Sequence, residues 1–292
     1  MKLRNVPGIK HARSLVKAAL VQDPKYIRYS IGCHALSLPF DHHLPKFQAR
    51  HRLYDRFLPV LCAQLPKSGL IVDVGANVGD TVAAILQTCA NPIIAIEGHL
   101  PYFEILKANL AKIDEKHRVT AVYALAGTTK KIGPLAANIG SSAFDPNNEL
   151  RMQAIDEILV ASLRDVALLK VDTDGYDDDV ILSGMGMIEA SQPLLFWEGG
   201  TTGATAFEGM YKNIEAFGYE QFWVFDNFGN LILEECRVKE LKSLDRYIAS
   251  LHNHKCSVGI NYIDVLASTP KTLGQARAAI LEYRCKFIEI FE

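Results

Sequence analysis

The chain has 292 residues, of which 49% are hydrophobic and 22% are charged, and its formal net charge is −2. These values suit a globular protein with one sizeable core and lack the basic excess that is typical of nucleic-acid binding. No run of about 18 apolar residues predicts a transmembrane helix, and six scattered cysteines without a Cys-x-x-Cys pair argue against zinc or disulfide frameworks and favour a cytoplasmic protein.

Residues 1–66 are expected to form an N-terminal extension of helix, hairpin and helix that packs on the core. The basic, mildly amphipathic start predicts a surface helix rather than a signal peptide. Residues 26–31 read as a strand, and residues 35–38 are placed to pair back as a hairpin. Apolar residues at helical spacing over 54–61 predict a helix that Pro59 kinks or restarts.

Residues 67–292 are expected to form one α/β domain. Short apolar runs alternate with helical patterns, and nearly continuous apolar strands between helices indicate a parallel sheet covered on both faces. The predicted strands are 70–74, 92–97, 119–125, 166–172 and 193–197, and the predicted helices are 80–88, 101–113, 177–184 and 207–217. The end of the chain predicts a hairpin of 221–225 with 231–234, a helix over 238–251, a strand over 262–267 and a last helix over 273–287.

A glycine-containing loop follows the first strand of this domain, with the pattern Asp73-x-Gly75-x-Asn77-x-Gly79. Glycines let the backbone approach a ligand closely, and the helix that begins at Asp80 directs its amide groups at the loop. The pattern is neither the dinucleotide Gly-x-Gly-x-x-Gly nor a Walker loop. A carboxylate at Asp73 suits the free ammonium group of S-adenosylmethionine better than a pyrophosphate, although a strand–turn–helix without ligand remains the alternative.

Glu97 ends the second strand of the domain, where a carboxylate can accept hydrogen bonds from both ribose hydroxyls of a cofactor. The alternative is a surface carboxylate at a strand end. Because Glu97 follows the glycine loop in the order expected for a nucleotide-cofactor unit, the binding role is favoured.

The fourth strand begins apolar and ends charged, with Lys170, Asp172 and Asp174 on one face while the backbone stays extended. Charges there are costly unless paired, and ligands bind at the carboxyl ends of such strands. We therefore expect these three residues at a catalytic site, with Glu198 on the same rim to orient the acceptor or hold Lys170. A purely structural Lys–Asp pair and a solvated Glu198 are the alternatives.

Two further motifs carry less information. Ser141 and Ser142 follow Gly140 after the third strand, where they either donate hydrogen bonds to a ligand or stabilise a turn. The segment 252–256 contains two histidines and a cysteine but no matching ligand pair, so no metal site is predicted.

Together these motifs resemble the FkbM-type family of class I S-adenosylmethionine-dependent methyltransferases. The resemblance covers roughly residues 67–200 and includes the loop from Val72 to Gly79, Ala95 to Glu97, the turn at Gly140 and the segment from Leu169 to Gly175. It implies a Rossmann-like sheet of seven strands with the last antiparallel, and helices on both faces. It also implies that the loop, including Ala76, contacts the amino acid end of the cofactor, that Glu97 contacts the ribose, and that Gly98 and His99 lie near the adenine. The family usually has Glu where this chain has Asp174.

The leading hypothesis is O-methylation of a hydroxyl on a sugar or secondary metabolite, with S-adenosyl-L-methionine as cofactor and no nucleic-acid partner. The sequence is also compatible with a homo-oligomer. A glycosyltransferase that uses Asp172-Thr173-Asp174 to hold a metal and a nucleotide sugar is the second hypothesis, although that activity does not need the glycine loop. A non-catalytic domain of methyltransferase type is the third.

Overall fold

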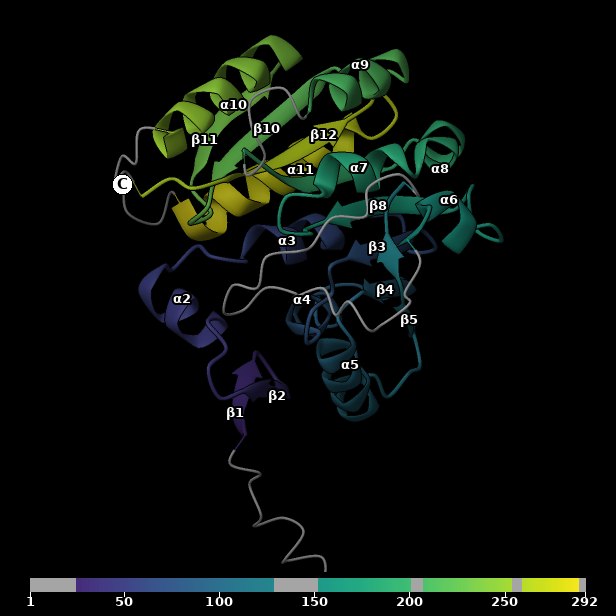
Figure 1. Ribbon diagram of the computed structural model, residues 1–292, viewed down its shortest axis with the longest axis vertical. Coiled ribbons are helices and arrows are strands. Elements are labelled where there is room, and N and C mark those ends of the chain that lie inside the picture. Colours follow the sequence, from purple (N-terminus) through teal and green to yellow (C-terminus); the bar gives the residue numbers. More distant parts are fainter. Residues whose placement is uncertain (1–24, 129–151, 201–206, 254–258, 289–292) are drawn as a thin grey trace, which may run out of the picture.

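The main sheet has eight strands, and its carboxyl edge gathers most of the residues that the sequence singles out. The computed structural model describes residues 25–128, 152–200, 207–253 and 259–288 (Figure 1). The strand order is β11-β10-β12-β9-β8-β3-β4-β5. The strands are β3 (Leu70–Val74), β4 (Ile93–Glu97), β5 (Val119–Tyr123), β8 (Val166–Val171), β9 (Leu194–Gly199), β10 (Gln221–Asp226), β11 (Leu231–Cys236) and β12 (Ile263–Ser268).

The expectation of a mostly parallel α/β sheet is confirmed, and the expected count of seven strands is wrong by one. Strands β5, β4, β3, β8 and β9 pair in parallel, while β12 runs antiparallel to both β9 and β10. The eighth strand is β11, the antiparallel hairpin partner of β10 at the sheet edge. Asp226 Oδ1 accepts hydrogen bonds from Phe228 N and Asn230 N, both at 2.9 Å, and so closes this hairpin.

Helices cover both faces of the sheet (Figure 1). Apolar side chains of one face pack with α3, α4, α5 and α11, and those of the other face pack with α7, α8, α9 and α10. The bounds are α3 (Phe57–Ala63), α4 (Asp80–Ile85), α5 (Leu100–Ile113), α7 (Asp177–Leu182), α8 (Met185–Ser191), α9 (Glu208–Ala216), α10 (Val238–Asn253) and α11 (Leu273–Tyr283), which a π-helical segment (Arg284–Ile288) continues. Smaller elements are α6 (Ile155–Ile158) and the parallel pair of β6 (Leu125–Ala126) and β7 (Met152–Gln153).

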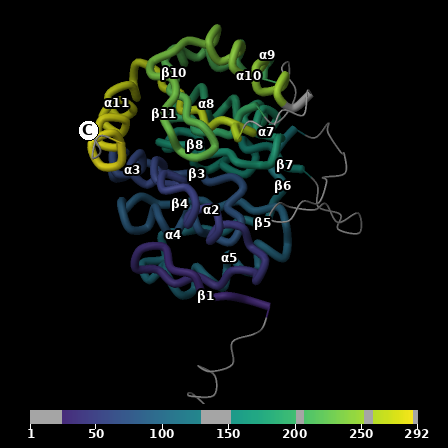
Figure 2. Tube along the Cα trace, turned by 90° about the vertical axis from the view of Figure 1, so that its left-hand side faces the viewer, coloured from purple at the N-terminus to yellow at the C-terminus, as the bar shows by residue number. Residues whose placement is uncertain are grey.

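The described part of the N-terminal extension is a hairpin followed by two short helices. Strands β1 (Tyr26–Ile31) and β2 (His34–Pro39) pair antiparallel, as the sequence predicts, and lie beside α5 (Figure 2). The buried Asn109 of α5 holds the hairpin, because its side chain accepts from Ser37 N at 2.8 Å and donates to Ser37 O at 3.0 Å. The helix expected over residues 1–21 lies outside the described residues.

The two helices after the hairpin differ from expectation in a way that proline explains. The helix α2 (Leu44–Arg50) was not predicted, and Pro45 falls in its first turn, where a missing N–H costs nothing. The next helix, α3, begins at Phe57 rather than near Tyr54, so Pro59 also falls in a first turn and neither kinks nor restarts the helix.

Candidate active site

The loop between β3 and α4 has three residues with left-handed backbone, namely Gly75 (φ +78°), Asn77 (φ +48°) and Gly79 (φ +87°). A Cβ atom at Gly75 would lie 1.8 Å from the carbonyl oxygen of Asp172. Glycine is therefore required at this position by the backbone at the end of β8, whether or not a ligand is bound. The sequence predicted a glycine loop open to a ligand and did not foresee this contact with Asp172.

The loop is also tied to the end of β4. The amide groups of Gly75 and Ala76 both donate to Ile96 O at 3.0 Å, and Ala76 is buried. Asp80 opens α4 next to this loop, and burial raises the pKa of its carboxyl while His42 and Lys170 oppose that rise. The predicted loop residues are therefore held together on one edge of the sheet.

Glu97 is only 3% exposed and holds two neighbouring segments by their backbone. Its Oε2 accepts from Asn77 N at 2.8 Å, and its Oε1 accepts from His99 N at 2.7 Å. Burial raises the pKa of Glu97 to about 7, against the effect of these two hydrogen bonds. Each carboxylate oxygen keeps a second lone pair, so the group can also accept from ligand hydroxyls.

The residues that follow Glu97 shape the start of α5. A Cβ atom at Gly98 would lie 2.5 Å from Leu125 Cδ2, so no side chain fits there without a shift. The His99 ring packs edge-on against Tyr102 with centroids 4.7 Å apart, and its buried Nδ1 has no hydrogen-bond partner among the described residues. Burial lowers the pKa of His99, which favours the neutral ring.

Lys170 lies between two carboxylates, and the nearer is Asp73. Its Nζ is 2.8 Å from Asp73 Oδ1, 3.5 Å from Asp172 Oδ2 and 3.2 Å from the carbonyl oxygen of Gly75. Burial alone would lower the pKa of Lys170, but Asp73 and Asp172 raise it, so the side chain is charged. The sequence paired Lys170 with Asp172, whereas the structure makes Asp73, which has no exposed surface, its closest partner.

Asp172 and Glu198 form a carboxyl pair at the ends of β8 and β9. The Asp172 side chain is 52% exposed, and the carboxyl group of Glu198 shares a hydrogen bond with it. Burial, followed by the charges of Asp172, Asp177 and Asp264, raises the pKa of Glu198 well above its usual value. A hydrogen bond between two carboxyl groups needs one proton, so this pair can hold and pass a proton.

The turn after β8 is anchored by a residue that the sequence analysis missed. The strand ends at Val171 and the backbone turns left-handed at Asp174 (φ +52°), so Asp174 leaves the alternation that Lys170 and Asp172 follow. The buried Asp177 accepts from Thr173 Oγ1 at 3.2 Å and from Glu198 N at 3.3 Å, and burial raises its pKa to about 7. The run of three aspartates that opens α7 was the available signal.

Four more polar residues surround the carboxyl pair, and none was predicted. Asp264 is the register partner of Glu198 across β12 and β9, and Tyr262 precedes it. Tyr54 and Asp55 belong to the extension, just before α3. Asp55 is exposed, whereas burial, followed by the charges of Asp172 and Asp55, raises the pKa of Asp264 well above its usual value. A lone aspartate at the start of an apolar strand was the signal for Asp264; Asp55 had none.

The extension also reaches the glycine loop directly. His42 Nε2 lies 3.4 Å from Asn77 Oδ1, and the His42 ring packs edge-on with Tyr102 at 6.3 Å between centroids. His42 was not among the site residues that the sequence predicts. Its position shows that the extension borders the same edge of the sheet as the predicted site residues.

Several expectations meet limits of the described residues. Ser141 and Ser142 lie outside them, as do 254–258 of the histidine segment. Within residues 25–128, 152–200, 207–253 and 259–288, no three His, Cys, Asp or Glu side chains are grouped so that they could hold a metal ion. No helix in the same ranges is long and apolar enough to cross a membrane.

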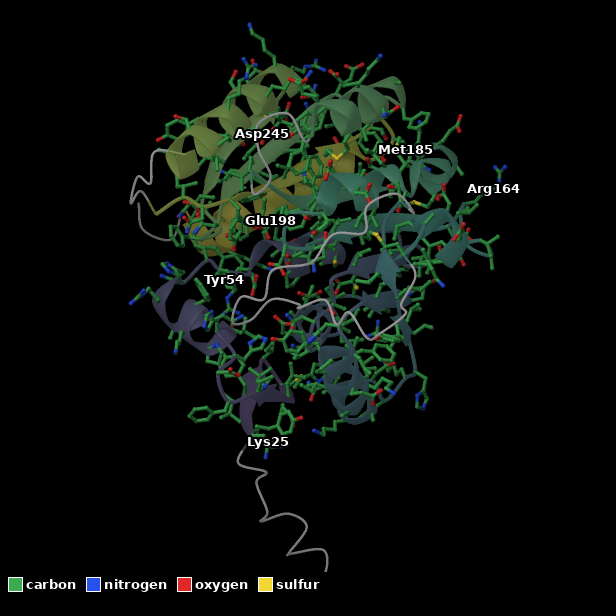
Figure 3. All side chains as sticks on the ribbon, in the orientation of Figure 1. Lys25, Tyr54, Arg164, Met185, Glu198 and Asp245 are labelled. Atoms are coloured by element: carbon green, nitrogen blue, oxygen red, sulfur yellow. The ribbon has the colours of Figure 1, made fainter. Side chains whose placement is uncertain are left out.

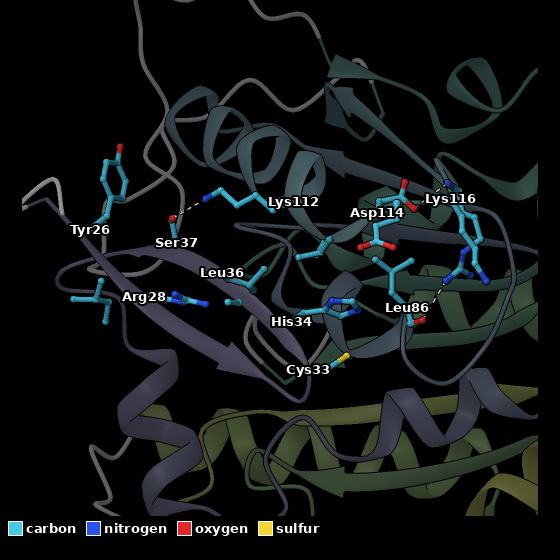
Figure 4. A pocket seen from close by; sticks show the side chains of 15 residues that line it. Tyr26, Arg28, Cys33, His34, Leu36, Ser37, Leu86, Lys112, Asp114 and Lys116 are labelled. Atoms are coloured by element: carbon cyan, nitrogen blue, oxygen red, sulfur yellow. Dashed lines mark hydrogen bonds between the residues drawn. The ribbon is translucent and has the colours of Figure 1, made fainter. Parts of the chain in front are cut away.

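A separate cleft of about 1000 Å³ lies between the β1–β2 hairpin and the end of α5 (Figure 4). Two of its basic side chains are used within the protein, since Lys112 Nζ donates to Ser37 Oγ at 3.0 Å and Arg118 donates to the carbonyl oxygens of Leu86, Cys89 and Asn91. It contains none of the predicted site residues. We interpret it as the seam where the hairpin joins the core.

Comparison with known proteins identifies one family. The family model described as the methyltransferase FkbM domain matches residues 73–221. No curated protein matches the sequence. The fold is similar to that of an FkbM methyltransferase from Methylobacillus flagellatus KT (15% identity, TM-score 0.41, covering 60% of this chain and 52% of that one). It is also similar to that of a precorrin-6y C5,15-methyltransferase from Geobacter metallireducens GS-15 (13% identity, TM-score 0.41, covering 73% of this chain and 86% of that one). A tRNA m1G37 methyltransferase from M. jannaschii has a similar fold as well (12% identity, TM-score 0.45, covering 85% of this chain and 57% of that one).

Proposed function

The chain belongs to the FkbM methyltransferase family, and we propose that it transfers a methyl group from S-adenosylmethionine to a hydroxyl group of a sugar or another secondary metabolite. The observation that carries the proposal is the contact between the glycine loop and the end of β8. The carbonyl oxygen of Asp172 fills the space that a Cβ atom of Gly75 would need. A cofactor loop and a paired carboxyl group are therefore immediate neighbours.

The residues at the loop edge fit the cofactor. The left-handed backbone at Gly75 and Gly79 turns the chain without a Cβ atom at either position, so a ligand can lie close to the loop. Glu97 keeps lone pairs for two ribose hydroxyls, and the unpartnered, buried Nδ1 of His99 suits the edge of an adenine. Asp73 has no exposed surface, so we propose that it acts through Lys170 and the loop rather than by touching the ligand.

When bound, S-adenosylmethionine would supply an electrophilic methyl carbon on a positively charged sulfur, which is left as a neutral thioether. A hydroxyl acceptor loses its proton as its oxygen gains the methyl group, so a nearby base speeds the reaction. We assign that role to Asp172, the most exposed carboxylate of the pair, with Glu198 sharing the proton. Lys170 is a positioning residue that holds Asp172 by an ion pair, and Asp174 shapes the turn at Gly175.

The proposal is tested by titrating the whole chain with S-adenosylhomocysteine in a calorimeter. Binding in the micromolar range is expected for wild type. A parallel titration with a nucleotide sugar and Mn²⁺ should show no binding, because the family match gives no support to the glycosyltransferase alternative. No affinity for any adenosyl compound would overturn the proposal and favour a non-catalytic domain. The free thiols of Cys62 and Cys89 agree with the proposed reducing, cytoplasmic compartment.

A further inference from the structure

The described extension runs from the β1–β2 hairpin to the carboxyl edge of the main sheet. Figure 3 marks Lys25, which precedes β1, and Tyr54, which follows α2, and in this view Tyr54 lies between Lys25 and Glu198 along the vertical axis. On this path the hairpin lies beside α5, and His42 reaches the glycine loop. The way in which the extension is attached therefore bears on the cofactor end of the site.

The tip of the hairpin is attached to the end of α4 by one side-chain amide. Gln87 donates to Ile31 O at 2.9 Å and accepts from Cys33 N at 3.0 Å. A Cβ atom at Gly32, in the same turn, would lie 1.8 Å from the side-chain oxygen of Gln87. The turn is therefore shaped to fit this amide, and the hairpin has a defined docking position on the core.

The middle of the hairpin is joined to the glycine loop by a second amide. Asn109 of α5 has no exposed surface, and its Oδ1 accepts from Ser37 N at 2.8 Å while its Nδ2 donates to Ser37 O at 3.0 Å. The same Nδ2 donates to Val78 O at 2.9 Å. One N–H group of the amide is thus used on the extension and the other on the loop. Asn109 is a direct bridge between the two segments.

This bridge fixes one peptide unit of the glycine loop. Val78 O and Gly79 N belong to the same peptide group, and Gly79 N donates to Ala76 O at 2.8 Å. Because Gly79 has a φ of +87° where α4 begins, the orientation of this peptide sets how the loop enters the helix. If Ser37 moved away, the Asn109 amide would lose two of its three hydrogen bonds and Val78 O would lose an oriented donor.

A second bridge reaches the loop from the segment that follows the hairpin. His42 Nδ1 accepts from Leu44 N at 3.3 Å, so the proton of the neutral ring lies on Nε2, which donates to Asn77 Oδ1 at 3.4 Å. Asn77 N in turn donates to Glu97 Oε2 at 2.8 Å. The extension therefore holds the side chain of the loop residue whose backbone is held by the proposed ribose ligand.

We infer that Asn109 and His42 are positioning residues of the cofactor site, and that docking of the hairpin and binding of the cofactor stabilise each other. The inference rests on the proposed function and adds a means of regulating the same site. Coupling between two binding equilibria is reciprocal, so a cofactor that favours the ordered loop favours the docked hairpin by the same factor. Ser37 and His42 lie outside the matched residues 73–221, so the family match by itself accounts for neither bridge.

Hydrogen–deuterium exchange of the whole chain measures this coupling in the wild type. Amide groups of a docked hairpin exchange when the hairpin opens locally, so their exchange rate reports how often it leaves the core. Peptides that cover residues 26–39 should exchange at least about threefold more slowly with saturating S-adenosylhomocysteine than without it. A hairpin that only packs on the core, without coupling to the loop, would show the same exchange in both conditions.

Ser37→Pro removes the N–H group that Asn109 accepts and changes no residue of α4, α5 or the glycine loop. The edge strand β2 already contains Pro39, two residues further on. The hairpin of this variant should exchange faster and no longer respond to S-adenosylhomocysteine, and the Kd for that ligand should rise at least about threefold in calorimetry. Lys112→Met is the matched control, because it removes an exposed hydrogen bond from α5 to Ser37 Oγ that does not reach the loop, and it should leave the Kd unchanged within about 1.5-fold.

A pair of His42 variants tests the second bridge without altering the hairpin. His42→Leu removes the donor to Asn77 and should raise the Kd for S-adenosylhomocysteine at least about twofold, whereas His42→Gln keeps an N–H group for Asn77 and should stay within about 1.5-fold of wild type. Wild-type hairpin exchange that ignores the ligand, or an unchanged Kd in both Ser37→Pro and His42→Leu, would overturn the inference. Failure of the wild type to bind S-adenosylhomocysteine would instead count against the proposed function.

Discussion

Lys170 and Asp73 are register partners on β8 and β3, and the Lys170 Nζ lies 2.8 Å from Asp73 Oδ1 with both side chains almost fully buried. The same ammonium group reaches the carbonyl oxygen of Gly75 and the carboxylate of Asp172. One buried cation therefore joins the start of the glycine loop to the carboxyl pair. Removing this cation should therefore lower the stability of the fold more directly than it lowers the rate of methyl transfer.

We expect Lys170→Met to lower the free energy of unfolding by about 3–5 kcal/mol, because it leaves the Asp73 carboxylate buried and unpaired. The double variant Asp73→Asn/Lys170→Met should recover part of that loss, since no uncompensated charge remains. Urea denaturation of the two variants without cofactor measures both values. A single variant as stable as wild type would show that Asp73 is neutral or finds another partner.

The two glycines of the loop should differ in what a side chain costs. In Gly75→Ala the new Cβ meets a backbone oxygen that cannot move without shifting the end of β8, whereas in Gly79→Ala it meets Leu106 Cδ1 at 2.8 Å, the tip of a flexible side chain. Both residues have positive φ, which adds strain of about 1–2 kcal/mol to each variant. We expect Gly75→Ala to lose at least about 1 kcal/mol more stability than Gly79→Ala in urea denaturation. The opposite order would mean that the end of β8 shifts more easily to make room for a Cβ atom than the Leu106 side chain does.

The order of elements in the core follows from patterns that the sequence displays openly. Apolar runs that end in Asp73, Glu97 and Asp172 predict both the strands and the edge at which their carboxyl ends meet. These residues are close because parallel strands place their ends together, which is a property of the fold class. The eighth strand was predicted as a hairpin partner but was not counted into the sheet.

The rest of the site depends on contacts between segments that are distant in sequence. The turn that carries Tyr54 and Asp55 reaches this edge because Phe57 packs against Phe196 and Phe225, and no local pattern around Asp55 carries that information. The preference of Lys170 for Asp73 over Asp172 likewise depends on the register of β3 and β8. Sequence patterns show which strand carries a charge. Which charges pair with one another can be predicted only when the register between the strands is known.

Glu97 should make cofactor affinity depend on pH. Its carboxyl has a pKa of about 7 in the folded protein, raised by burial from 4.5, and its ionised form is the better acceptor for ribose hydroxyls. Affinity for S-adenosylhomocysteine should therefore rise about five- to tenfold between pH 6 and pH 8 in calorimetric titrations. In Glu97→Ala the affinity should be lower and flat across this range. A wild-type affinity that does not change with pH would remove Glu97 from the ribose site.

The same shift predicts how stability without cofactor changes with pH. Glu97 and Asp177 both bind a proton more tightly when folded, since their pKa values are about 7 against 4.5 and 3.8. The stabilisation that these raised pKa values give the folded protein is complete below about pH 4 and is lost as pH rises through 7. The melting temperature should therefore fall from pH 6 to pH 8, and Asp177→Asn should flatten the fall. A steeper fall in that variant would contradict the assignment.

Asp172→Asn gives the sharpest test of the proposed base. The substitution keeps the shape of the side chain and removes its charge, and the carbonyl oxygen that fixes Gly75 belongs to the backbone and is unchanged. Cofactor affinity should stay within a few fold of wild type, while methyl transfer to an identified acceptor should fall by about 10²–10⁴. Glu198→Gln should lower the rate less, because Asp172 remains to accept the proton, and Asp174→Asn less again, because its left-handed position shapes the turn. Near-normal turnover in Asp172→Asn would remove it from the catalytic residues. Loss of S-adenosylhomocysteine binding would place it instead among the residues that hold the cofactor.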